Sequence, residues 1–173
     1  MGKKKSLSNK LWLLSAALPL VGYLYYISAM DIYRAWCVGG VFIGKENVRF
    51  QTRENDCGPA SLQMIFDHYS ICSTIDAVGR SAGLTEKGVT MFALKQTAKL
   101  NGLDADGWRL TAEELSHSQF PALLFVNHDH FVVADSVCGD EFFLRDPAIG
   151  RVRISRAMLS RIWKGETLLF HSK

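Results

Sequence analysis

The chain lacks the features of several common protein classes. Its 173 residues contain only four cysteines, and no two of them form a C-x-x-C pair, so neither a disulfide framework nor a zinc site is expected. The net charge is only +3, without an arginine-rich helix or aromatic–basic alternation, which argues against a nucleic-acid surface. We expect no cofactor and no metal. The cysteines are Cys37, Cys57, Cys72 and Cys138.

A nucleotide site is not expected either. Residues 39–45 read G-x-x-x-x-G-K, but Glu46 stands where a phosphate loop needs Ser or Thr to bind magnesium. No apolar helical pattern follows this segment. We therefore interpret residues 31–46 as a linker, or a short strand, that leads into a single domain over residues 47–173.

The N-terminus combines a basic flank with an uncharged run. Residues 1–10 carry four lysines and no acid, and residues 11–30 carry no charge. About 20 apolar residues can span a bilayer as a helix. The run lacks a good cleavage site and has tyrosines near its end, which favours an uncleaved transmembrane anchor over a signal peptide. The basic residues 1–10 would then stay in the cytoplasm of a bacterium, and the domain would lie outside the inner membrane.

Residues 51–61 form the stretch on which the chemistry depends. A polar run ends at Asp56 and is followed by Cys57, Gly58 and Pro59. An amphipathic helical pattern then begins at Leu62, and Pro is favoured in a first helical turn. Cys57 is thus predicted at the N-terminus of a helix, where a thiolate is stabilised and can act as a nucleophile. The alternative is a small buried apolar cysteine. Gly58 is expected to open space beside the sulfur, and Asn55 and Asp56 to hold the preceding turn without a catalytic role.

The rest of the chain predicts helices first and strands afterwards, which is the α+β arrangement. A capping box, Thr111 to Glu114, opens a short helix, and Ser155 is expected to cap a late one. Continuous apolar runs predict buried strands, with a turn at Gly139-Asp140. Further helices are expected at residues 74–82 and 90–100. The helix that opens at the capping box should end at about residue 116, and the one capped by Ser155 should run through residue 163. Strands are expected at residues 122–126, 131–137, 141–145 and, at the sheet edge, 167–170.

A base for the Cys57 thiol is expected at the start of a strand. A hairpin closed at Gly139-Asp140 pairs residues whose numbers sum to about 279, which places Asp146 just past His130 on the neighbouring strand. His128 is an alternative base, although a strand holds a base better than a turn does. Asp129 and Asp135 are alternatives for the acid that orients the base, and Asp135 is expected to be buried and paired.

Three motifs resemble those of the bacteriocin-processing, double-glycine leader peptidases, a papain-like cysteine peptidase family. They are Gln51 six residues before Cys57-Gly58-Pro59-Ala60-Ser61-Leu62, then residues 130–133, then residues 146–150. The resemblance covers about Asn47 to Phe170 and implies a papain-like fold. It also implies that Cys57 attacks, His130 is the base, Asp146 orients it, and Gln51 donates to the oxyanion hole.

The resemblance further implies a cysteine peptidase that cleaves leader peptides after a Gly-Gly pair, from secreted peptides or exported subunits. Members of the family are usually fused to an ATP-driven exporter, whereas this chain has neither transporter spans nor a credible phosphate loop. We therefore expect a membrane-anchored peptidase that works beside a separate exporter or secretion apparatus. The alternatives are a non-catalytic module that binds leaders, and another papain-like hydrolase, for instance one that acts on cell-wall peptides.

Overall fold

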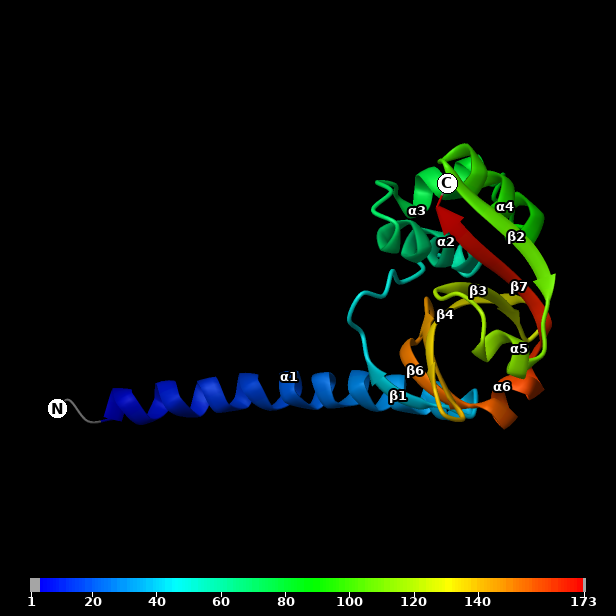
Figure 1. Ribbon diagram of the computed structural model, residues 1–173. Helices are drawn as coiled ribbons and strands as arrows, with labels where there is room; N and C mark the ends of the chain where they lie inside the picture. Colours follow the sequence, from blue (N-terminus) through cyan, green and yellow to red (C-terminus); the bar gives the residue numbers. More distant parts are fainter. Residues whose placement is uncertain (1–3, 173) are drawn as a thin grey trace.

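A seven-stranded antiparallel sheet forms the centre of the domain. The computed structural model describes the backbone of residues 4–172 and the side chains of residues 17–171. The strands are β1 (Val41–Gly44), β2 (Leu103–Arg109), β3 (Ala122–Val126), β4 (His130–Cys138), β5 (Glu141–Asp146), β6 (Gly150–Ser155) and β7 (Trp163–Ser172). They lie in the order β1-β6-β5-β4-β3-β7-β2, and the sheet is strongly curved (Figure 1).

The predicted helices are present, and their first residues follow from local side chains. They are α1 (Lys4–Cys37), α2 (Cys57–His68), α3 (Ile75–Ser81), α4 (Met91–Leu100), α5 (Ala112–Ser116) and α6 (Arg156–Ile162). The predicted capping box is confirmed, because the Thr111 side chain accepts from the Glu114 N–H and the Glu114 side chain accepts from the Thr111 N–H. Ser155 caps α6 as expected.

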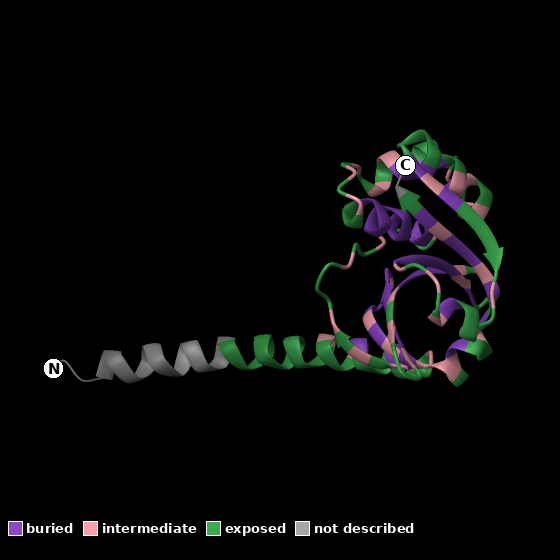
Figure 2. Cartoon of the chain, in the orientation of Figure 1, coloured by how far each residue is buried: buried purple, intermediate pink, exposed green. Residues whose placement is uncertain are grey.

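The two faces of the sheet are covered by different helices. On β4, Phe131 and Val133 pack in one core with α2, α3 and α4, whereas Val132 and Ala134 pack in a second core with α5 and α6. This alternation follows from the period of two in a strand. Figure 2 shows α2 and the central strands as the most buried elements. The predicted α+β fold is therefore confirmed, with a core on each side of the sheet.

The edges of the sheet differ from the prediction. Residues 167–170 were expected to form an edge strand, but β7 lies between β3 and β2, so this prediction is wrong. The edges are β1 and β2. The sequence did not indicate β2, because only Leu103 and Ala105 are buried along its seven residues and the apolar signal is weak. Of the segment predicted as a linker or a short strand, residues 41–44 form strand β1, which pairs with β6.

Helix α1 extends away from the domain (Figure 1). Among the described residues, no helix combines the length and the apolar character needed to cross a membrane. Residues 11–16 of the predicted span lie outside the residues whose side chains are described. The structure therefore gives no support to the transmembrane helix predicted over residues 11–30.

Candidate active site

Cys57 is the first residue of α2, as predicted, and the loop before it is held by Asp56. The Asp56 side chain does not cap the helix. Its carboxylate instead turns back and accepts hydrogen bonds from the Thr52 and Arg53 N–H groups and from the Thr52 hydroxyl, the last at 2.8 Å. Asp56 is fully buried, so these bonds compensate the burial of a charge. The expected structural role of Asp56 is confirmed, and the N–H groups that open α2 stay free of a side-chain cap.

Gly58 has a different role from the expected one. A Cβ at this position would lie 2.5 Å from Val89 and 3.2 Å from Phe131. The space that a side chain at residue 58 would fill is thus occupied by Val89 and Phe131, and Gly58 does not open space beside the sulfur. Cys57 itself is only 6% exposed. Any reacting group must therefore approach the sulfur through a narrow opening.

The predicted contact between His130 and Asp146 is present. The His130 Nε2 atom lies 2.9 Å from Asp146 Oδ1, and Asp146 is 6% exposed. The same carboxylate oxygen accepts the Ala148 N–H at 2.7 Å, which fixes the carboxylate in the turn after β5. Because Nε2 faces Asp146, the ring nitrogen left for the Cys57 thiol is Nδ1.

The strand register explains how these two residues meet. Near the turn, Val137 pairs with Phe142, so the residue numbers sum to the predicted 279. The register shifts between Ala134 and Ser136, and the sum becomes 278 at Val133 and Arg145. A bulge at Asp135 therefore moves Asp146 by one residue along β4, which the sequence did not indicate.

The charge state of His130 is set by its two neighbours. Burial lowers the pKa of the ring, but hydrogen bonds to Asp146 and Cys57, together with the negative charges of both groups, outweigh it and raise the pKa from 6.5 to about 10. At neutral pH the ring is thus an imidazolium beside the Asp146 carboxylate. A positive charge next to a cysteine favours the thiolate, which is the nucleophilic form.

A buried side chain that the sequence analysis missed holds Cys57 and His130 together. The Ser61 hydroxyl, one turn into α2, donates to the Phe131 carbonyl on β4 at 3.0 Å. Ser61 is fully buried. This bond joins the helix of the thiol to the strand of the imidazole. A serine next to an apolar helical pattern carries no signal of such a role, because its partner is 70 residues away.

Gln51 makes hydrogen bonds to two segments, the turn after β5 and the loop before Cys57. Its backbone N–H donates to the Pro147 carbonyl at 3.0 Å, which links the loop before Cys57 to the turn that begins at Asp146. Its side-chain Nε2 donates to the Arg53 carbonyl at 3.0 Å, and the second N–H of this amide remains for another acceptor. The side-chain Oε1 is buried without a hydrogen-bond partner among the described residues.

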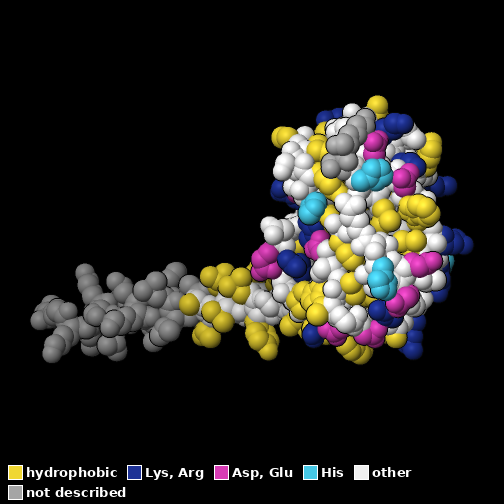
Figure 3. All heavy atoms as spheres, in the orientation of Figure 1, with side chains coloured by type: hydrophobic (Ala, Val, Ile, Leu, Met, Phe, Trp, Pro, Cys, Tyr) yellow, Lys and Arg dark blue, Asp and Glu magenta, His cyan; other side chains and the backbone are white. Residues whose placement is uncertain are grey.

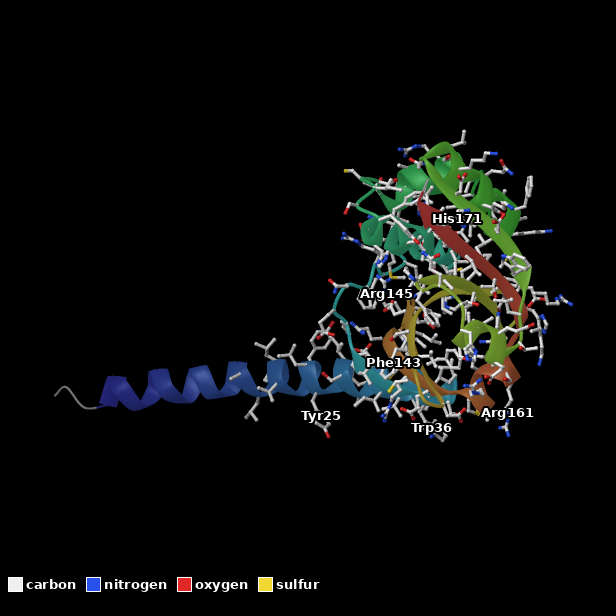
Figure 4. All side chains as sticks on the ribbon, viewed as in Figure 1. Tyr25, Trp36, Phe143, Arg145, Arg161 and His171 are labelled. Atoms are coloured by element: carbon white, nitrogen blue, oxygen red, sulfur yellow. The ribbon has the colours of Figure 1, made fainter. Side chains whose placement is uncertain are left out.

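The alternative residues are placed elsewhere. His128 is exposed in the β3–β4 turn, where Asn127 and His128 both have positive φ angles, and Asp129 is exposed beside it. Asp135 is paired as expected, with Arg145 Nη2 at 2.7 Å, but it is only half-buried, so the expected burial is partial. Arg145 is labelled in Figure 4. Of these candidates, His130 and Asp146 are the pair whose side chains contact each other.

Two cavities flank the reacting groups. The Cys57 cavity, of about 300 Å³, is lined by Cys57, Phe125, Phe131 and the turn at residues 86–89. The His130 cavity, of about 320 Å³, is lined by His130, Asp146 and apolar residues of β4, β5 and β6. Glu54 and Asp129 line both. Among the described residues, no cluster of three or more His, Cys, Asp or Glu side chains could hold a metal ion.

Comparison with known proteins gives consistent matches. The lactococcin-G-processing and transport ATP-binding protein LagD of Lactococcus lactis is 31% identical over 131 residues, which are 72% of this chain and 18% of LagD. The chain therefore spans less than a fifth of that relative's length. An uncharacterized protein of Methanothermobacter marburgensis is 30% identical over 128 residues, which are 74% of this chain and 90% of that protein.

A solved structure is also similar. The crystal structure of a double glycine motif protease from an AMS/PCAT transporter, in complex with the leader peptide, has a TM-score of 0.70 and 29% identity, and the match covers 78% of this chain and 98% of that one. Residues 45–173 match the Peptidase C39 family, so the match includes every residue of the site just described. On this evidence the chain belongs to the Peptidase C39 family.

Proposed function

We propose that the chain is a cysteine endopeptidase that cleaves leader peptides after a Gly-Gly pair. The observation that carries the proposal is the arrangement of Cys57, His130 and Asp146: His130 Nε2 lies 2.9 Å from the Asp146 carboxylate, and Asp146 and Cys57 together raise the pKa of the ring. A module that only binds leaders has no need of a nucleophile paired with a charged imidazole.

The reaction follows from the geometry. The Cys57 thiolate, paired with the His130 imidazolium, attacks the peptide carbonyl to form a tetrahedral intermediate. The Gln51 side-chain amide and the Cys57 N–H stabilise its oxygen. His130 then gives its proton to the leaving amine as the carbon–nitrogen bond breaks and a thioester forms. The neutral ring then takes a proton from water, which hydrolyses the thioester and restores the thiolate beside the imidazolium. Asp146 keeps the ring oriented throughout.

The preference for glycine is supported by the narrow approach to the sulfur. Cys57 is 6% exposed, and its cavity is lined by Val89 and by the Phe125 and Phe131 rings, whose centroids are 4.8 Å apart. A substrate Cβ next to the scissile bond would meet these walls, whereas glycine has none. The similar crystal structure is that of a double glycine motif protease with its leader peptide, which agrees with this reasoning.

Substrate and location complete the proposal. LagD is named as a processing and transport protein. By analogy, the substrate is an exported peptide or subunit with a leader, handed to a separate exporter or secretion apparatus. Between residues 17 and 30, α1 exposes apolar side chains, among them Leu18, Leu24 and Tyr25, the last labelled in Figure 4 (Figures 3 and 4). We propose that residues 11–30 of α1 lie in the inner membrane, with the peptidase domain periplasmic or outside the cell.

The orientation is tested with two reporters fused after Lys173. A reporter that is active only outside the cytoplasm should give a strong signal, and one that fluoresces only in the cytoplasm should not. A strong cytoplasmic signal would overturn the orientation. Release of the chain from membranes by high salt would overturn the anchor, because a hydrophobic span is not displaced by ionic strength.

The activity is tested with the full chain in detergent. A peptide with a Gly-Gly leader should be cut directly after the second glycine, and a matched peptide with Ala-Ala there should not. Cys57→Ala and His130→Ala should abolish cleavage, whereas His128→Ala, two residues away, should not. Equal cleavage by Cys57→Ala would refute the proposal. Tight leader binding by the wild type without cleavage would favour a binding module, and cleavage of cell-wall peptides alone would favour another hydrolase.

A further inference from the structure

A groove formed partly by α1 adjoins the His130 cavity. The α1 groove has a volume of about 700 Å³ and is lined by residues 34, 37–38, 50–54 and 147–149. It shares four residues with the wall of the His130 cavity, which are Val38, Glu54, Ala148 and Ile149. The two spaces therefore meet along one wall, and an extended peptide at His130 can continue into the α1 groove.

The chemistry decides which half of a substrate lies on this side. In thiol catalysis the acyl half becomes bonded to the sulfur, and the leaving amine receives its proton from the imidazole. The Cys57 cavity is lined by Cys57 and not by His130, so it suits the leader half. The His130 cavity is lined by His130 and not by Cys57, so it suits the released half. Glu54 and Asp129 line both cavities, so they would lie near the new amino terminus, which they would stabilise as an ammonium ion.

The end of α1 is a fixed wall of this groove. Ala35 is fully buried and packs with Ile149 and Val152. Asp31 is 7% exposed, and its carboxylate lies 2.5 Å from the Lys45 ammonium. Asp31 and Ala35 lie before residue 45, where the family match begins, so α1 contributes residues outside that match to the wall of the groove.

We propose that the end of α1 helps to select the first residues of the released chain. This inference rests on the proposed function, since it concerns the other half of the same substrate. The His130 cavity has an apolar lining that includes Val132, Leu144 and Ile154, and it would take an apolar side chain just after the cleavage site. In the α1 groove, Arg34 has no ion-pair partner among residues 17–171, whereas Arg53 pairs with Asp76. Arg34 therefore favours an acidic residue farther along the released chain.

The test compares two peptides that are identical up to Gly-Gly and then carry one valine, followed by three aspartates or three lysines. Binding is measured by fluorescence anisotropy to the full chain with Cys57→Ala, and cleavage by kcat/KM of the wild type. At low salt the aspartate peptide should bind about three- to tenfold more tightly than the lysine peptide. Arg34 attracts the aspartates through a partly exposed ion pair and repels the lysines. The difference should shrink at physiological ionic strength.

Two variants of the Cys57→Ala chain locate the effect. Arg34→Glu should reverse the preference between the peptides, whereas Arg161→Glu should not, because Arg161 lies on α6 and lines neither cavity. A leader peptide that ends at Gly-Gly should bind equally to all three proteins. Val38→Phe, which narrows the passage between the cavities, should lower kcat/KM more for a bulky first residue than for alanine.

The outcomes separate the two proposals. Cleavage without any dependence on the residues after Gly-Gly, or equal effects of Arg34→Glu and Arg161→Glu, would overturn the role of α1 and leave the peptidase activity intact. Charge-dependent binding without cleavage by the wild type would support the role of α1 as a binding surface and refute the peptidase.

Discussion

The contact between His130 and Asp146 yields the most direct prediction, through the variant Asp146→Asn. The substitution keeps the shape of the side chain and removes its charge, 2.9 Å from the imidazole. At an effective dielectric constant of about 20, two unit charges at this distance interact by about 6 kcal/mol, and desolvation offsets much of this. Opposite charges at such range typically shift a pKa by about 1–3 units. The pKa of His130, raised to about 10 in the wild type, should therefore fall to roughly 7–9.

The assay is the pH profile of kcat/KM on a Gly-Gly leader peptide. Because activity needs the imidazolium, the alkaline limb of the pH profile follows the pKa of His130. If that pKa falls by about two units, activity at pH 9 should drop about tenfold from loss of the charged form alone. Alkylation of Cys57 reports the thiolate and needs no proton from His130, so its rate should not fall along this alkaline limb. It is measured in a chain that carries Cys37→Ser, Cys72→Ser and Cys138→Ser, because these three thiols are exposed.

A matched control is Asp104→Asn, which makes the same change on β2, away from the site. It should leave both profiles unchanged. An unchanged alkaline limb in Asp146→Asn would refute the reasoning, because it would mean that the carboxylate does not set the charge of His130. A complete loss of activity at every pH, with the fold intact, would mean that orientation of the ring matters more than its charge.

Three further predictions follow from the same site. Gln51→Ala should lower kcat by about 10²–10³-fold with little change in KM, since it removes one oxyanion donor. Gln51→Glu keeps the size of the side chain but replaces the donor with an acceptor, so it should not restore the rate. Asp56→Ala should lower the free energy of unfolding by about 1–3 kcal/mol, because it leaves the Thr52 and Arg53 N–H groups without their acceptor; Thr52→Val, which removes only the hydroxyl bond, should cost less in chemical denaturation. The folded-state pKa of His130 lies above 6.5, so the protonated ring stabilises the fold fully below pH 6.5 and this contribution is lost as the pH rises to about 10. The thermal midpoint should fall across that window, and it should fall less in Asp146→Asn; an equal fall in both would assign it to other groups.

Local patterns in the sequence were enough to predict most of the elements. The start of α2 at Cys57 follows from Pro59 and the amphipathic run after it, and four hydroxyl side chains mark the first turns of α3 to α6. The β4–β5 hairpin follows from two apolar runs around Gly139, and this spacing indicates that Asp146 lies near His130, although the one-residue shift at the Asp135 bulge does not follow from it. These features depend on contacts between residues close in sequence, which is why spacing alone could indicate them.

Contacts between distant residues needed the tertiary structure. The places of β1, β2 and β7 in the sheet, the bond from Ser61 to Phe131, and the link from Gln51 to Pro147 all join segments whose separation leaves no periodic signal. The same is true of α1, whose composition alone predicted an anchor but whose end lines a groove beside the site. A sequence records which residues can react, because that depends on residue type and local geometry. Where the groove runs, and which charges meet in it, is decided by the packing of the whole chain.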